Sequence, residues 1–294
     1  MAEADPIFPG GNTVGTVYLV GAGPGDPELL TLRAARLIGG ARLVVHDGLV
    51  DDAILALVPR DAEMISVAKS RARHTLSQEK INALLVREAL AGRDVIRLKG
   101  GDPFIFGRGG EEMEACRAAG VPVEIVPGIS AAIGCAAEAG LPLTHRSMAS
   151  AVTFVAGQCK GLTEQNWAGL AGQDRTLVIY MGVATSADIA EKLMADGLSP
   201  AMPVAVLEKG TRADGRTFVT NVADLGGLVA RERVQSPALI VVGEVARHVK
   251  TGLAFEGLLP DSLPVRPELV EGLSFHREEE RGFDRLSPSG TGKL

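Results

Sequence analysis

Short apolar runs alternate along this chain with segments of helical periodicity. The run 17–20 ends on Gly21, which predicts a buried strand. Asp26 can cap a helix that begins at Pro27 and has one apolar face, formed by Leu30, Ala34, Leu37 and Ile38. The alternation continues to Gly140, with strands expected at 42–45, 94–98 and 121–126, and with helices from Ser77 to Gly92, at 111–119 and at 129–139. This regularity predicts a mostly parallel sheet that is covered on both faces.

Residues 141–147 interrupt the rhythm, and a second α/β unit follows them. Its strands are expected at 152–156, 176–181, 203–208 and 237–243, and its helices at 185–196 and 222–231. Asp214-Gly215 predicts a hairpin turn, so this sheet should be mixed. The expected fold class is therefore α/β with two α/β domains. Their expected limits are a flexible tail at 1–14, domains at 15–145 and 146–250, and a largely disordered extension at 251–294.

Composition and charge limit the class of protein. Hydrophobic residues make up 46% and charged residues 22% of 294 residues, as in ordinary globular chains. A net charge of −6 excludes a globally basic nucleic-acid binder, although a local basic patch could still bind a polyanion. The acidic N-terminus is unlike a signal peptide and no apolar run is long enough to span a membrane, so a cytoplasmic location is expected. Cys116, Cys135 and Cys159 are expected to be buried thiols, with no metal site.

Two glycine-rich loops follow predicted strands. Gly21-Ala-Gly-Pro-Gly25 resembles a dinucleotide fingerprint, but Asp26 stands where a further glycine would be expected. An acid there would compete with a pyrophosphate for the N–H groups at the helix start, although a tight turn without a ligand remains an alternative. Gly100 and Gly101 allow close approach of a ligand, and Asp102 could accept hydrogen bonds from a ribose or an amino group but would repel phosphate. Both loops favour a nucleoside without phosphates.

Several motifs in order carry a family resemblance. They are Val17 to Thr31, Arg97 to Glu111, Val126-Pro-Gly-Ile-Ser-Ala131, Leu141-Pro-Leu-Thr-His-Arg146, Tyr180-Met-Gly182 and Glu208-Lys-Gly-Thr211. Over residues 15–250 the chain resembles the tetrapyrrole methylase family. The resemblance implies two α/β domains with S-adenosylmethionine bound in a cleft between them, usually in a homodimer.

The resemblance also implies site residues. The expected cofactor-binding positions are Pro24, Gly100, Gly101, Asp102, Ile105, Ser130, Ala131, Met181, Gly210 and Ala238. The expected catalytic positions are Asp47, Lys69, Arg108, Glu111 and Arg146. Members with this pattern methylate uroporphyrinogen III at C2 and C7, giving precorrin-2 through precorrin-1 on routes to cobalamin and sirohaem. No metal is implied.

Other interpretations of these residues remain open. Met181 follows a strand and could be core packing, the basic stretch 69–74 could be a solvated loop, and Arg108 could form a salt bridge to Glu111 or Glu112 at helical spacing. A substrate with eight carboxylates would need clustered Arg and Lys side chains. Asp47 or Glu111 is the expected acceptor of the proton that the methylated ring must lose, because an arginine is a poor base.

Other functions are also possible on this scaffold. One is another corrin-ring methyltransferase or a diphthine synthase, and another is a nucleotide-binding regulator, which would need phosphate-binding features that are missing here. From the length we do not expect the multifunctional sirohaem synthase arrangement, because no NAD-binding domain precedes Gly15 in this sequence.

Overall fold

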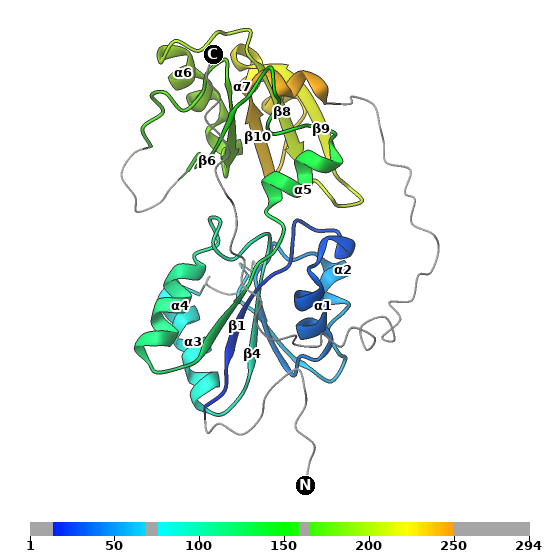
Figure 1. The fold of residues 1–294 in the computed structure, drawn as a ribbon, viewed down its shortest axis with the longest axis vertical. Helices are drawn as coiled ribbons and strands as arrows, with labels where there is room; N and C mark the ends of the chain where they lie inside the picture. Colours follow the sequence, from blue (N-terminus) through cyan, green and yellow to red (C-terminus); the bar gives the residue numbers. More distant parts are fainter. Residues whose placement is uncertain (1–13, 69–75, 159–164, 250–294) are drawn as a thin grey trace, which may run out of the picture. The chain divides into compact units, whose positions relative to one another are not determined.

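The described strands form two five-stranded sheets (Figure 1). The structure is a computed structural model, which describes residues 14–68, 76–158 and 165–249. Expectations for the two chain ends, for Lys69 and for Cys159 lie outside the described residues. No helix among the described residues is both long and apolar enough to cross a membrane.

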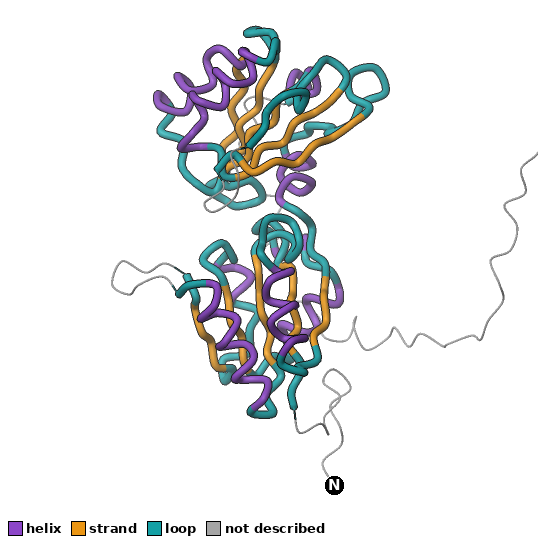
Figure 2. The backbone as a smooth tube through the Cα atoms, turned by 90° about the vertical axis from the view of Figure 1, so that its left-hand side faces the viewer, coloured by secondary structure: helices purple, strands orange, loops and turns teal. Residues whose placement is uncertain are grey.

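The first sheet is parallel throughout and has the strand order β3-β2-β4-β1-β5. Its strands are β1 (Val17–Gly21), β2 (Leu43–His46), β3 (Glu63–Ser66), β4 (Val95–Lys99) and β5 (Val123–Val126). Its helices are α1 (Leu32–Gly39), α2 (Asp52–Leu55), α3 (Gln78–Leu90) and α4 (Gly109–Ala118). Apolar residues of α1 and α2 pack on one face, and those of α3 and α4 pack on the other. The covered parallel sheet predicted from the alternation is confirmed (Figures 1 and 2).

The second sheet is mixed, as the hairpin signal predicted. Its order is β6-β7-β10-β8-β9, in which only β6 and β7 run parallel. The strands are β6 (Ala151–Ala156), β7 (Arg175–Tyr180), β8 (Pro203–Glu208), β9 (Arg216–Asn221) and β10 (Ala238–Val242). Helices α6 (Ser186–Ala195) and α7 (Leu225–Arg231) pack on one face, with η2 (Val183–Thr185) and η3 (Val222–Asp224) leading into them. The other face packs on α5 (Ala131–Glu138) and η4 (Glu244–His248).

The start of the first helix differs from the expectation. Asp26 caps only a short 3-10 turn, η1 (Pro27–Leu29), by accepting a hydrogen bond from the Glu28 amide. The chain then becomes extended at Leu30, and Thr31 caps α1 by accepting from the Ala34 amide. A helix that is continuous from Pro27 is therefore wrong, because two capping residues five positions apart each begin a separate element.

Strand β3, helix α2 and the 3-10 helix η4 were not predicted, and strand β9 was implied only by the hairpin turn. Strand β3 has a mostly exposed burial pattern at the sheet edge, so it lacks the apolar run that marks the inner strands. Helix α2 spans four residues, too few to show a periodicity.

The two Cys residues that the structure describes, Cys116 and Cys135, are buried and unpaired, as expected. Burial raises the pKa of Cys116 to about 11 and of Cys135 to about 12, so both stay protonated thiols near neutral pH.

Candidate functional site

The two glycine-rich loops meet at the carboxyl edge of the first sheet. Gly23 and Gly101 form an isolated bridge, in which the Gly101 amide donates to the Gly23 carbonyl at 2.7 Å. Both glycines have φ near +70°, a region that residues with a Cβ rarely adopt. A Cβ at Gly101 would meet only the Ala131 amide nitrogen, at 3.7 Å, so the backbone there is open to a ligand. The carboxyl edge of a parallel sheet is where α/β folds bind ligands.

Asp102 ties this edge to the loop that follows β5. Its Oδ1 accepts from the Phe104 amide at 2.8 Å, and its Oδ2 accepts from the Gly128 amide at 3.1 Å. Both carboxylate oxygens therefore hold backbone in the structure. A Cβ at Gly21 would lie 2.5 Å from the Gly128 nitrogen, so the loops after β1, β4 and β5 are in close contact.

The predicted cofactor residues of the second half share one edge of the mixed sheet. Met181 follows β7, Gly210 follows β8, and Ala238 begins β10 beside Glu208. Tyr180 links this edge to the start of α5: its hydroxyl lies 2.5 Å from the Ser130 Oγ and accepts from the Ala132 amide at 3.0 Å. Burial is the main cause that raises the pKa of Tyr180, so it stays a neutral phenol.

Further contacts reach α5 and the loop after Asp102. The Phe106 ring lies against Tyr180, with ring centroids 4.8 Å apart. A Cβ at Gly210 would lie 2.7 Å from the Cys135 Sγ, and a Cβ at Gly134 would lie 2.6 Å from the Pro24 Cγ. All ten predicted cofactor residues are thus on the two loop edges or on the α5 start that contacts them.

Backbone strain is concentrated at these edges. Six non-glycine residues in the described ranges have positive φ: Phe106, Arg108, Met181, Lys209, Thr211 and Arg233. All but Arg233 are predicted site residues or direct neighbours of one. Such conformations cost about 1–3 kcal/mol each and are most common at binding and catalytic sites.

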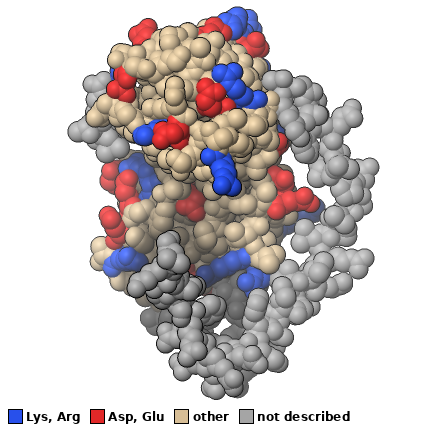
Figure 3. Space-filling model, turned by 45° about the horizontal axis from the view of Figure 1, so that its top comes forward, with Lys and Arg blue, Asp and Glu red and all other residues tan. Residues whose placement is uncertain are grey.

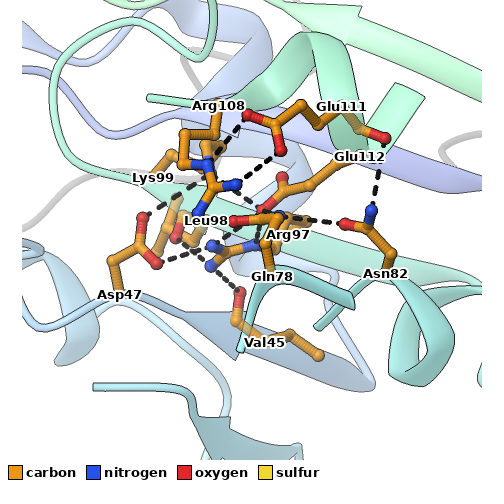
Figure 4. A network of polar contacts seen from close by, with 10 residues as sticks. All are labelled: Val45, Asp47, Gln78, Asn82, Arg97, Leu98, Lys99, Arg108, Glu111 and Glu112. Carbon is orange, nitrogen blue, oxygen red and sulfur yellow. Dashed lines mark hydrogen bonds and ion pairs between the residues drawn. The ribbon is translucent and has the colours of Figure 1, made fainter. Parts of the chain in front are cut away.

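Asp47 lies beside a buried group of charges (Figure 4). It follows β2, its side chain is 28% exposed, and its Oδ1 accepts from the Arg97 Nη2 at 2.6 Å. The Lys99 Nζ lies 3.7 Å from its Oδ2. Burial lowers the pKa of Lys99, and the positive charge of Arg97 adds to this, while Asp47 and Glu112 oppose it.

Arg108 and Glu111 form a salt bridge at the start of α4. Two parallel bonds join them, Nε to Oε1 at 2.8 Å and Nη2 to Oε2 at 2.6 Å. The hydrogen bond from Arg108 is the main cause that lowers the pKa of Glu111. The alternative interpretation of Arg108 as an ion-pair partner is therefore confirmed for Glu111, and the bond makes Glu111 a weaker base.

Arg146 takes no part in these polar contacts. It is exposed and makes no ion pair or hydrogen bond within the described part of the chain. The neighbouring His145 stacks on His248, with ring centroids 5.2 Å apart. An open hollow of about 510 Å³ adjoins this segment, but none of the predicted site residues lines it. On the face seen in Figure 3, acidic and basic side chains are interspersed rather than gathered into one basic area.

Several charged residues near the site were missed by the sequence analysis. Arg97 and Lys99 stood out only as parts of a motif, and Glu112 only as an alternative partner of Arg108. Arg97 and Glu112 are almost fully buried and bond to each other. The sequence does contain a signal for these residues. Arg97 and Lys99 are two positions apart in a strand that is otherwise apolar, which puts both side chains on one face of the sheet. Among the described residues, no group of three or more His, Cys, Asp or Glu side chains is placed to hold a metal ion.

The two sheets, with both glycine-rich loops of the first beside Asp102, agree with the two α/β domains that the family resemblance implies. Residues 16–226 match the family model of Tetrapyrrole (Corrin/Porphyrin) Methylases. The chain belongs to this family.

Individual relatives agree with this assignment. The chain is 52% identical over 246 residues to the siroheme synthase of Gluconacetobacter diazotrophicus, covering 83% of this chain and 52% of that protein. The solved uroporphyrin III C-methyl transferase of Thermus thermophilus matches with a TM-score of 0.69 at 42% identity, covering 79% of this chain and 94% of the other. The same enzyme in complex with S-adenyl homocysteine matches with a TM-score of 0.69 at 41% identity, with the same shares covered. The chain spans about half the length of the curated relatives it matches.

Proposed function

We propose that this chain transfers methyl groups from S-adenosylmethionine to uroporphyrinogen III. Methylation at C2 gives precorrin-1, and methylation at C7 then gives precorrin-2, a precursor for cobalamin and sirohaem. The observation that carries the proposal is the 42% identity to a uroporphyrin III C-methyl transferase, almost all of whose length this chain covers. The geometry of the loop edges and of the charged side chains beside them also supports this proposal.

The two loop edges fit a nucleoside that carries no phosphate. The 3-10 turn after β1 is too short to be a phosphate-binding helix start, and the Asp26 carboxylate already accepts the Glu28 amide there. The open backbone at Gly101 allows close approach of an adenosyl or methionyl group. Residues that would hold S-adenosylmethionine are Pro24, Gly100, Gly101, Asp102, Ile105, Ser130, Ala131, Met181, Gly210 and Ala238.

The substrate of this reaction is a flexible ring with eight carboxylates, and the protein must supply cations for them. Arg108 and Arg146 are both exposed and can each bind a carboxylate through two parallel bonds. Lys69 is a third candidate, outside the described residues. Exposed apolar side chains between β4 and α4, those of Phe104 and Phe106, lie near the same edge and suit a pyrrole face.

The reaction requires the protein to align the pyrrole carbon with the sulfonium methyl group and to provide a proton acceptor. An electron-rich pyrrole carbon attacks the sulfonium methyl in line, so that a C–C bond forms, the S–CH3 bond breaks and a thioether leaves. The methylated ring is cationic and becomes neutral when a meso C–H proton is removed. We assign this proton to Asp47 rather than Glu111. Both Glu111 oxygens accept hydrogen bonds from Arg108, whereas only Oδ1 of Asp47 accepts one from Arg97, and its Oδ2 lies 3.7 Å from the Lys99 Nζ.

Incubation with uroporphyrinogen III and labelled S-adenosylmethionine tests the proposal. The expected product carries two added methyl groups by mass. One added methyl group, or none, would instead favour another corrin-ring methyltransferase or a diphthine synthase. Titration calorimetry should detect S-adenosylhomocysteine binding and no NAD or ATP binding, whereas the reverse result would favour a nucleotide-binding regulator.

We also propose that the active form is a homodimer, as the family resemblance implies. Light scattering coupled to size exclusion should give twice the mass of the chain. A monomer with full activity would contradict this.

A further inference from the structure

The central strand of the first sheet carries two buried cations. Arg97 and Lys99 lie at alternate positions of β4, so both side chains project from the same face, and each is only 2% exposed. Strand β4 lies between β2 and β1 in the middle of the sheet. Charges are rarely buried in such a place because the loss of hydration is costly.

A glutamate from the facing helix binds both cations. Glu112, in the first turn of α4, is fully buried. Its Oε1 accepts from the Arg97 Nε at 3.1 Å and the Lys99 Nζ at 3.0 Å, and from the Gln78 Nε2 of α3 at 3.2 Å. The Arg97 Nη1 also donates to the Val45 and Leu98 carbonyls, at 3.4 and 3.3 Å, so the guanidinium is fixed in its plane.

Asp47 is the one member of this quartet that reaches solvent. Arg97, Lys99, Asp47 and Glu112 carry two positive and two negative formal charges, and Figure 4 shows their side chains converging from β2, β4 and α4. Arg97 contacts Asp47 Oδ1 at 2.6 Å, while Lys99 lies 3.7 Å from Oδ2. The Asp47 carboxylate is thus held through Oδ1 by Arg97, while Oδ2 is farther from its cation and the side chain remains 28% exposed.

Stability alone is a weak reason to keep such a group. Apolar residues of similar volume in place of a buried ion network often leave a protein as stable or more so. What the network does supply is a carboxylate whose position is fixed by rigid elements, which catalysis requires to within about half an ångström.

We propose that Arg97, Lys99 and Glu112 are positioning residues that hold the Asp47 carboxylate for removal of the proton from the methylated substrate. The inference rests on the proposed methyl transfer. It assigns no contact with substrate or cofactor to the three buried residues, which act through Asp47.

Two variants remove parts of the quartet without leaving a large uncompensated charge. Arg97→Lys keeps the charge but loses the Nη2 bond to Asp47. The double variant Lys99→Met/Glu112→Gln removes one cation and one anion together and leaves the Arg97–Asp47 pair. Arg93→Lys is the matched control, because Arg93 also bonds two carboxylates, those of Glu63 and Glu88, but precedes the opposite end of β4.

Turnover and binding should separate in these variants. We expect kcat to fall about 10- to 100-fold in both quartet variants, while the KM for uroporphyrinogen III and the Kd for S-adenosylhomocysteine stay within about threefold of wild type. Both variants should melt cooperatively, and Arg93→Lys should keep the wild-type kcat.

A double-mutant cycle then tests whether the effect passes through Asp47. Labelled methyl groups allow the residual rate of Asp47→Asn to be measured over long incubations. Adding Arg97→Lys to Asp47→Asn should lower this rate by less than twofold, because the carboxylate that Arg97 positions is already gone. A full second loss, or an unchanged kcat in a folded quartet variant, overturns the inference. If wild type transfers no methyl group to uroporphyrinogen III, the proposed function fails and this inference fails with it.

Discussion

Glu111 occupies one edge of the Arg108 guanidinium, the Nε and Nη2 donors, and so competes with a substrate carboxylate for this side chain. The two side chains are 55% and 49% exposed, and such exposed pairs are worth about 0.2–1 kcal/mol. Glu111→Gln should therefore lower the KM for uroporphyrinogen III about two- to fivefold with little change in kcat. Glu244→Gln is the matched control, since Glu244 bonds Arg247 at the same i,i+3 spacing. A large fall in kcat would instead make Glu111 the proton acceptor.

Variants of Arg146 should separate an effect on substrate binding from an effect on the stability of the protein. Because it is exposed and has no polar partner among the described residues, Arg146→Ala should melt as wild type does and bind S-adenosylhomocysteine normally. If Arg146 binds a substrate carboxylate through two bonds, methylation should be almost lost, and Arg146→Lys should also be impaired because an ammonium lacks the planar geometry. Normal turnover in Arg146→Ala would remove the residue from the site.

Asp102 has a structural role that its sequence context did not reveal. Since its two oxygens accept backbone amides from Phe104 and Gly128, Asp102→Ala should destabilise the protein by about 2 kcal/mol as well as weaken cofactor binding. Asp102→Asn retains one acceptor oxygen and should recover part of the loss. Thermal unfolding without ligand, paired with calorimetry, checks this. Unchanged melting with weakened binding would favour direct contact with the ligand alone.

At the scale of single residues, sequence patterns located the site edge but not its charge network. Gly100, Gly101 and Asp102 stand out because they follow an apolar strand, and such positions lie at a sheet edge. Glu112 does not stand out, because burial of a helix carboxylate depends on which face packs against the sheet. That Glu112 bonds Arg97, 15 residues earlier, follows only from how α4 packs on β4.

At the scale of the elements, α5 lies so close to the loop after β8 that there is no room for a side chain at Gly210. A Cβ at this position would lie 2.7 Å from both the Cβ and the Sγ of Cys135. Gly210→Ala should therefore cost about 1–3 kcal/mol of stability even without ligand, as overpacking does. Gly39→Ala is the control, since nothing lies within 4 Å of its built Cβ. Equal melting temperatures for the two variants would mean that the loop moves aside freely.

The burial of each strand explains which elements could be predicted from the sequence. Inner strands such as β4 and β8 are buried along their whole length and appear as continuous apolar or nearly apolar runs. Edge strand β3 has no such run, and the helix expected from Pro27 is divided because Thr31 provides a second cap. The bridge between Gly23 and Gly101 follows from two neighbouring parallel strands that end at one edge, which the alternation of elements already implied.

At the scale of the whole molecule, the predicted boundary between the two domains at 145/146 can be tested. The packing of α5 against the second sheet provides the test. Although α5 precedes the predicted boundary at 145/146, its residues Ala132, Cys135 and Ala136 belong to the core that covers one face of the second sheet. A fragment of residues 146–249 would lose this cover, together with the buried Leu141, at a cost on the order of 4 kcal/mol.

A fragment of residues 130–249 keeps α5 with its sheet and serves as the matched comparison. We expect 130–249 to unfold cooperatively, and 146–249 to melt at a much lower temperature or without a clear transition and to bind a dye for exposed apolar surface. The reason is that the inner residues of β7, β8 and β10 on that face, among them Val178, Ala205 and Val241, would have no apolar partner from α5. Equal cooperativity and equal melting temperatures of the two fragments would place the functional boundary at 145/146 and make α5 dispensable for the second sheet.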